Sequence, residues 1–196
     1  MRKYFKSILF TISILTLFLS ISCLEEYVPP TISLDSPEDT LRTFVYAFNH
    51  HYEPDAIKIL ASTLTDDFTF YFDPKDAGIK MDGYIIPDSW NKDEFLTACL
   101  NMFNNAYSIN LDIPQLETGL KGQYNSNGNE FYCETDINFL LYVSQSQGYQ
   151  AVGPVDWRFR KCDDGKWRIY AIYDHTSPEL FTIVNASWGE ILFTYR

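Results

Sequence analysis

The charged side chains that could do acid–base chemistry are concentrated on three runs between Phe131 and Asp174, namely FYCETDINFLLYV, VDWRFRK and KWRIYAIYD. Each run alternates apolar and polar residues, which is the period of a strand with one buried face. The polar positions fall opposite the apolar ones and are Glu134, Asp136, Asn138, Asp156, Arg158, Arg160 and Arg168. A carboxyl gains acid–base power from an apolar environment, which raises its pKa. The alternation therefore predicts a salt-bridged outer face without catalytic residues, on which Asp136 pairs with Arg158 or Arg160.

Two adjacent pairs also contain groups that transfer protons, His50 with His51 and Asp174 with His175. Neighbouring residues of a strand point to opposite faces, so His175 cannot be oriented by Asp174 as a base would be. We interpret all three histidines as solvated surface residues. No spacing of His, Cys, Asp and Glu matches a metal site, and no glycine-rich phosphate loop or Gly-x-Ser-x-Gly motif occurs. The sequence predicts neither a metal nor a cofactor.

The composition indicates a folded, acidic protein. Of 196 residues, 17% are aromatic, including 15 Phe and 14 Tyr, which is enough for a packed core and argues against disorder. The formal net charge is −11. Such a chain is repelled by phosphate backbones, so we expect no nucleic-acid partner. The length fits one domain with an export segment.

Residues 1–22 are predicted to be an export signal. A basic start, with Arg2, Lys3 and Lys6, precedes an apolar run that ends at Ile21. This run is too short for a permanent membrane span, and a small residue follows it.

The ending LSISC resembles a bacterial lipobox, with Ser20 in the place where leucine is usual. The resemblance implies that the chain is cut before Cys23 and that this cysteine is acylated. Two or three acyl chains anchor a protein stably, whereas one is marginal. Ordinary secretion, with Cys23 as a chance residue, is the alternative. Residues 23–35 contain two prolines and no strand or helix period, so we expect a tether.

Three helices are predicted ahead of the long strands. Ser36 and Pro37 begin the first, Pro54 and Asp55 begin the second, and Ser89 caps the third. Apolar residues recur in them at helical spacing. These are Leu41, Phe44, Val45, Phe48 and Tyr52, then Ile57, Leu60 and Ala61, and finally Phe95, Leu96, Cys99, Leu100 and Phe103.

Shorter strands are predicted at residues 66–73 and 107–113, with a further short strand near residues 84–86. The first turns Phe68, Phe70 and Phe72 to one face, and the second does the same with Tyr107, Ile109, Leu111 and Ile113. In the long runs Trp157 and Trp167 are in phase with the apolar residues, so both should face the helices. The closing sequence NASWGEI does not decide between strand and helix.

Three cysteines remain beside Cys23. Export would permit a disulfide. Cys133 and Cys162 lie opposite one another across a hairpin, but the register that pairs the aromatic residues puts them on opposite faces. We therefore favour free, buried Cys99 and Cys133.

The order helix, helix, strand, helix and four long strands resembles the NTF2-like superfamily, also called SnoaL-like or cystatin-like. The matching features are SPEDTLRTFVYAF, LASTLTDDFTFYF and GKWRIYAIYDH, and the ending ASWGEILFTYR is similar to the close of uncharacterised exported lipoproteins of this type. The resemblance implies an α+β cone, in which three N-terminal helices pack on a curved, mostly antiparallel sheet. The cone would span residues 36–176, with residues 177–196 as a closing segment. The superfamily includes isomerases, cyclases, dehydratases, epoxide hydrolases and binding modules, so the fold implies no single activity.

The resemblance also places a pocket on the apolar sheet face beneath the helices. Its expected lining is Phe44, Phe48, Phe70, Phe103, Phe139, Trp157, Trp167 and Ile169. Because no acid of the strands faces this pocket in the alternation, we favour a non-catalytic module.

The favoured hypothesis is a module that is anchored to a membrane of the bacterial envelope, faces the periplasm or the exterior, and binds a small apolar ligand or a partner protein. One alternative is a SnoaL-like isomerase or hydrolase with Asp174, Asp156 or Asp67 as its base. Another is a structural dimer that pairs through the outer sheet face. We expect a monomer or a weak homodimer.

Overall fold

The computed structural model describes residues 32–145, 147–176 and 184–196. The predicted signal, Cys23 and the tether as far as Thr31 lie outside the described residues. Residues 32–196 form one unit. Within the described part of the chain, no helix is both long and apolar enough to cross a membrane.

The described residues of this unit form five helices and ten strands. The helices are α2 (Pro37–Asn49), α3 (Ala56–Ser62), α4 (Lys92–Asn105), α5 (Gln115–Thr118) and α6 (Trp188–Thr194). The strands are β1 (Leu64–Tyr71), β2 (Lys80–Met81), β3 (Tyr84–Ile85), β4 (Ser89–Asn91), β5 (Ser108–Asp112), β6 (Gly122–Tyr124), β7 (Glu130–Tyr142), β8 (Gly148–Lys161), β9 (Trp167–Asp174) and β10 (Val184–Asn185).

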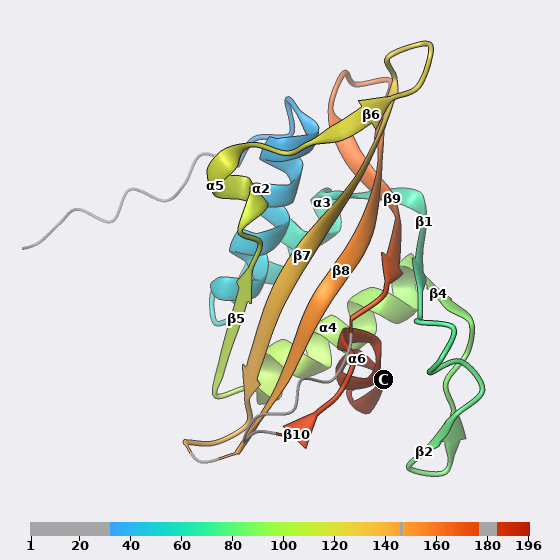
Figure 1. The fold of residues 1–196 in the computed structure, drawn as a ribbon. Coiled ribbons are helices and arrows are strands. Elements are labelled where there is room, and N and C mark those ends of the chain that lie inside the picture. Colours follow the sequence, from blue (N-terminus) through green and yellow to red (C-terminus); the bar gives the residue numbers. More distant parts are fainter. Residues whose placement is uncertain (1–31, 146, 177–183) are drawn as a thin grey trace, which may run out of the picture. The chain divides into compact units, whose positions relative to one another are not determined.

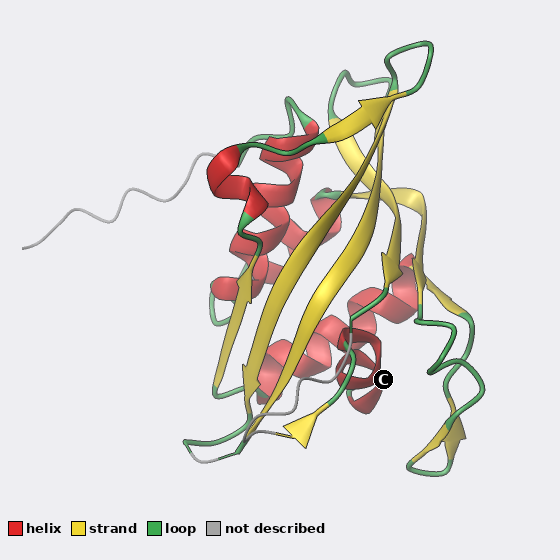
Figure 2. Cartoon of the chain, viewed as in Figure 1, coloured by secondary structure: helices red, strands yellow, loops and turns green. Residues whose placement is uncertain are grey.

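Eight of the strands form one sheet. In it β4, β1, β9, β8, β7 and β5 follow in order, β6 also pairs with β7, and β10 pairs with β8. The pairs are antiparallel except β1 with β9 and β10 with β8. Figures 1 and 2 show α2, α3 and α4 together on one side of the long, curved β7 and β8. The predicted α+β architecture of helices on a mostly antiparallel sheet is confirmed.

Helix α2 begins as the sequence predicts. The Ser36 side chain accepts a hydrogen bond from the Asp39 amide at 3.0 Å, and Pro37 takes the first helical position. Leu41 and Phe48 have no exposed surface. The helix ends at Asn49, so Tyr52 does not continue its apolar stripe and is 72% exposed.

Helix α4 begins two residues later than predicted. Residues Ser89–Asn91 form β4 instead, which pairs with β1. The cap is Asn91, which accepts from the Glu94 amide at 3.0 Å while the Glu94 carboxylate accepts from the Asn91 amide at 2.9 Å. This reciprocal pair satisfies two amides that a helix start leaves free.

Besides Tyr52, two further apolar positions of the predicted elements are exposed. Leu100 is 42% exposed, because the buried face of α4 runs through Phe95, Cys99 and Phe103 and Leu100 lies a third of a turn aside. Tyr107 is 60% exposed, because it precedes the first residue of β5.

The long strands turn their phenylalanines and tryptophans toward the helices, as predicted. Cys133 pairs with Trp157 and Phe139 with Ala151 across β7 and β8, and these four residues are buried. Trp157 has no exposed surface, and its indole nitrogen donates to the Thr135 hydroxyl at 2.9 Å. Trp167 is 5% exposed. Both tryptophans therefore belong to the core.

We predict that Trp157→Ala lowers the free energy of unfolding by about 3–5 kcal/mol, because it removes a fully buried ring and leaves a cavity. Urea denaturation followed by circular dichroism measures the loss. Tyr107→Ala, which removes an exposed ring, is the matched control and should cost less than about 0.5 kcal/mol. A loss below about 1 kcal/mol for Trp157→Ala would contradict the face assignment.

Candidate functional site

Five of the eight side chains predicted to line a pocket meet around a single ring, that of Trp188 in α6. Ring centroids lie 5.6–6.3 Å from that of Trp188 for Phe44, Phe48, Phe70, Phe139 and Trp157. None of the six side chains has exposed surface. These spacings and tilted or edge contacts are those that aromatic rings prefer. The interior of the cone is thus filled by the protein's own tryptophan.

The other three predicted residues are buried but lie apart from Trp188. Phe103 packs edge-on against Phe48 at 5.3 Å. Trp167 lies beside Tyr124 at 5.9 Å. Ile169 is buried in β9 and pairs with Phe159 of β8. The expected pocket lining is therefore divided, and the part that gathers around one point contains only five of the eight residues.

Helix α6 is held in place through its first turn. The Gly189 amide donates to Asp174 Oδ2 at 2.7 Å, and the Trp188 amide donates to Thr176 Oγ1 at 2.7 Å. Ser187 and Glu190 form a capping box, and the Ser187 hydroxyl also donates to Asp76. A side chain at Gly189 would place its Cβ 2.7 Å from the Phe72 ring and 3.1 Å from Asp174 Oδ2. Only glycine allows this approach.

Asp174 faces the interior, which corrects the prediction that no acid does. Strand β9 carries one extra residue, Tyr170, because Phe159 pairs with Ile169 while Arg158 pairs with Ala171. An extra residue reverses the side-chain alternation that follows it. Asp174 therefore shares the inner face with its partner Val155 and has no exposed surface.

Burial raises the pKa of Asp174 to about 6, although three hydrogen bonds oppose the shift. Its Oδ1 accepts from the Thr176 amide at 2.9 Å and the Thr176 hydroxyl at 2.7 Å, and its Oδ2 accepts from Gly189. The nearby charge of Asp76 raises the pKa further. Asp174 thus combines the pKa of a near-neutral base with three hydrogen bonds from protein donors.

The other acids of the enzymatic hypothesis lie on the outer face, as the alternation predicts. Asp67 pairs with Arg160 at 2.8 Å, and Asp156 lies 3.6 Å from Arg158. The predicted partners of Asp136 are wrong, because Asp136 pairs with Pro154 in the sheet and accepts from Gln115 at 3.1 Å.

Stacked rings, and not salt bridges alone, organise this outer face. The Arg158 guanidinium lies 4.8 Å from the Tyr132 ring centroid and 5.6 Å from that of Tyr173. Tyr173 in turn stacks on Tyr71 at 4.4 Å with the planes 3° apart. A row of three tyrosines and one arginine therefore crosses β7, β8, β9 and β1.

The three histidines differ in their surroundings. His175 Nε2 is 3.8 Å from Asp156 at the surface, and the His50 ring stacks on Tyr46 at 4.0 Å. His51 is half-buried against Phe103, and burial holds its pKa below the usual value. The interpretation as a solvated residue is therefore wrong for His51.

The cysteines are free thiols in the described chain, as favoured. Cys99 and Cys133 are buried, and Cys162 is half-exposed. Burial raises the pKa of the Cys99 thiol and raises that of Cys133 to about 12. Within the described residues, no group of three or more His, Cys, Asp and Glu side chains is placed to hold a metal ion.

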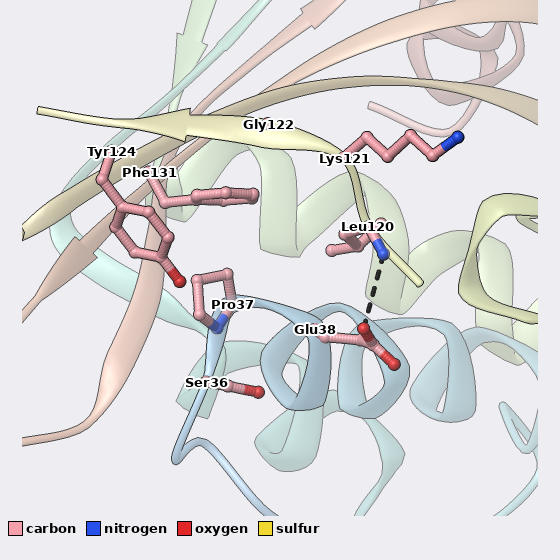
Figure 3. Close-up of a pocket in the computed structure, with 8 residues that line it drawn as sticks. All are labelled: Ser36, Pro37, Glu38, Leu120, Lys121, Gly122, Tyr124 and Phe131. Atoms are coloured by element: carbon pink, nitrogen blue, oxygen red, sulfur yellow. Dashed lines mark hydrogen bonds between the residues drawn. The ribbon is translucent and has the colours of Figure 1, made fainter. Parts of the chain in front are cut away.

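A surface hollow of about 450 Å³ lies between the start of α2 and strand β6 (Figure 3). Tyr124 and Phe131 pack against each other on one side of it, at 4.8 Å between ring centroids. On the other side Glu38 accepts a hydrogen bond from the Leu120 amide at 3.4 Å. This hollow differs from the Trp188 site in its residues, because none of the six side chains that meet at Trp188 lines it.

We predict that Asp174 makes the protein less stable as the pH rises. Its pKa in the folded state is about 6 against 3.8 in the unfolded state, so its contribution is full below pH 3.8 and is lost as the pH rises through 6. The full change is about 3 kcal/mol, and about 2 kcal/mol of it falls between pH 4.5 and 7.5. Urea denaturation of the parent and of Asp174→Asn at these two pH values measures this part, since the variant lacks the titration. Equal pH dependence in both proteins would contradict a raised pKa.

Comparisons with known proteins identify the fold. No protein-family model matches the chain, and no curated protein matches it by sequence. Among solved structures, a candidate scytalone dehydratase from Novosphingobium aromaticivorans matches with a TM-score of 0.55 at 10% identity, over 76% of this chain and 87% of that one. A candidate aromatic ring hydroxylase from the same organism matches with a TM-score of 0.53 at 12% identity, over 79% and 92%.

A candidate dehydratase of the NTF2-like family from Streptomyces avermitilis matches with a TM-score of 0.48 at 16% identity, over 72% of this chain and 92% of that one. Identities this low show the fold and no activity. The order of helices and strands described above is the one that the sequence resemblance implies. The chain shares the fold of the two Novosphingobium aromaticivorans proteins, and it is the α+β fold that the NTF2-like resemblance implies.

Proposed function

We propose that this protein is a lipid-anchored module of the bacterial envelope that binds a small apolar ligand in its aromatic cone and performs no chemistry on it. One observation carries the binding function. Five inward rings, contributed by α2, β1, β7 and β8, surround a single planar ring on several sides. Ligand sites of this kind are lined by apolar and aromatic side chains with few polar groups.

The arrangement of acids supports a non-catalytic role. Asp174 is the acid of β9 that faces the cone, and three protein donors occupy three of the about four acceptor positions of its carboxylate. A general base needs a free lone pair within reach of the proton that it removes, and Asp174 has no exposed surface while α6 is in place. Asp67 and Asp156 lie on the opposite face.

The predicted anchor is tested by Cys23→Ala. The substitution removes the thiol that would carry the lipid, so the precursor should no longer incorporate a fatty-acid probe and should leave the membrane fraction. Metabolic labelling followed by gel fluorescence measures incorporation. Cys162→Ala, which removes a half-exposed thiol of the folded domain, is the control and should label like the parent. Equal labelling of Cys23→Ala and the parent would refute the anchor.

The ligand itself can be sought by mass spectrometry of an organic extract from protein purified out of its own membrane. We expect one apolar compound to be enriched, and to be more abundant in Trp188→Ala, which opens space inside the cone. Leu116→Ala truncates a core residue of α5, away from the Trp188 ring, and should behave like the parent. No enriched compound in the parent or in Trp188→Ala would count against a binding cone.

A second candidate function is an isomerase or hydrolase that uses Asp174 as its base. The pKa of about 6 favours it, because a base titrating near neutral pH is efficient. This function needs α6 to leave, which would free Asp174 Oδ2 from Gly189. Turnover of an extracted ligand that is lost in Asp174→Asn would favour the enzyme.

A further inference from the structure

We propose that α6 is an intramolecular competitor for the cone, and that the ligand it imitates is an arylethylamine, a flat fused ring that carries an amine two carbons away. This inference rests on the proposed binding function and narrows the ligand to a compound with an apolar fused ring and a single amine. It derives from the path of atoms between the Trp188 ring and the acid at the wall of the cone.

Trp188 serves as a template for the ligand. Its fused ring occupies the aromatic box, and its backbone nitrogen follows the ring after two carbons, Cβ and Cα. That nitrogen donates to Thr176 Oγ1 at 2.7 Å, and Thr176 Oγ1 donates to Asp174 Oδ1 at 2.7 Å. An amine at the same position would meet a hydroxyl acceptor that is backed by a carboxylate.

A protonated amine would also replace the second contact that α6 makes. When α6 leaves, Asp174 Oδ2 loses the donor that Gly189 supplies at 2.7 Å. An ammonium group has three donors, so it can serve both Thr176 and Asp174. A buried carboxylate is stabilised by an opposite charge within hydrogen-bond distance of its oxygens. The same acid repels a ligand that carries a carboxylate.

Two features of the packing of α6 in the cone favour its replacement by a ligand. The Trp188 indole nitrogen is fully buried and has no hydrogen-bond partner within the described structure, and an unpaired buried donor opposes burial. The close approach of Gly189 to Phe72 leaves no room for a side chain, so a single methyl group should loosen the helix. A helix of seven residues depends on such tertiary contacts.

When a tethered competitor occupies the site, the apparent Kd of a free ligand equals its intrinsic Kd divided by the fraction of molecules in which the site is open. Tryptamine is the probe, since it has the ring, the two carbons and the amine. We expect calorimetric titration to show at least about tenfold tighter binding to Gly189→Ala than to the parent, which corresponds to about 1.4 kcal/mol of weakened α6 docking. Trp188→Phe keeps the helix and shrinks the ring, so its affinity should rise as well.

Two controls separate competition from general loosening. Leu116→Ala truncates a core residue of α5 and should bind tryptamine like the parent. Indole-3-propionate keeps the ring and replaces the amine with an acid, so it should bind Gly189→Ala at least about tenfold more weakly than tryptamine does. Asp174→Asn added to Gly189→Ala should remove that preference.

The proposal fails if folded Gly189→Ala and folded Trp188→Phe both bind tryptamine no better than the parent. It also fails if Leu116→Ala gains as much as they do, or if the acid binds as well as the amine. If the extract contains a compound bound in the cone but tryptamine binds the parent, Gly189→Ala and Trp188→Phe equally well, competition by α6 is refuted. This result would still support the binding function. An empty extract would count against the binding function itself.

Discussion

Between Ile169 and Ala171, β9 carries one residue more than β8, and the interior beyond that point depends on this irregularity. The extra residue turns Asp174 inward, where its carboxylate meets the Gly189 amide. That hydrogen bond holds the first turn of α6, and the first turn carries Trp188 into the cone. Without the bulge, Asp174 would lie at the surface and α6 would lose its anchor inside the sheet. One inserted residue thus connects the sheet to the C-terminal helix.

The sequence predicts the parts of this fold that rest on local rules. Alternation along β7 and β8 assigns the faces correctly, since each strand is long and its two faces differ clearly in polarity. The cap at Ser36 is also local and is confirmed. The cap of α4 lies two residues later than predicted, because Ser89 belongs to β4 and pairs with β1. Local sequence rules do not predict such pairing between distant segments.

The interior site could be predicted only in part. The five rings around Trp188 follow from alternation and helical spacing, but nothing in the sequence places a bulge at Tyr170. Strict alternation therefore predicts that Asp174 faces outward. A signal for α6 does exist, because Ser187 and Glu190 have the spacing of a capping box. That signal indicates a helix start, yet it does not show where Trp188 packs, since its ring contacts join residues that are 31 to 144 positions apart in the chain.

The burial of two thiols implies that they can be oxidised only while the chain is unfolded. Cys99 and Cys133 are held away from solvent, and their raised pKa values keep them as unreactive thiols. The proposed export would bring the chain into surroundings that favour disulfides. Folding therefore competes with oxidation of the thiols. Thiols that are still reduced when the chain folds are then protected by burial. Molecules in which Cys99 or Cys133 has formed a disulfide would accordingly be those that folded late or unfolded again. The fraction of such molecules measures how long the chain was unfolded in the presence of an oxidant.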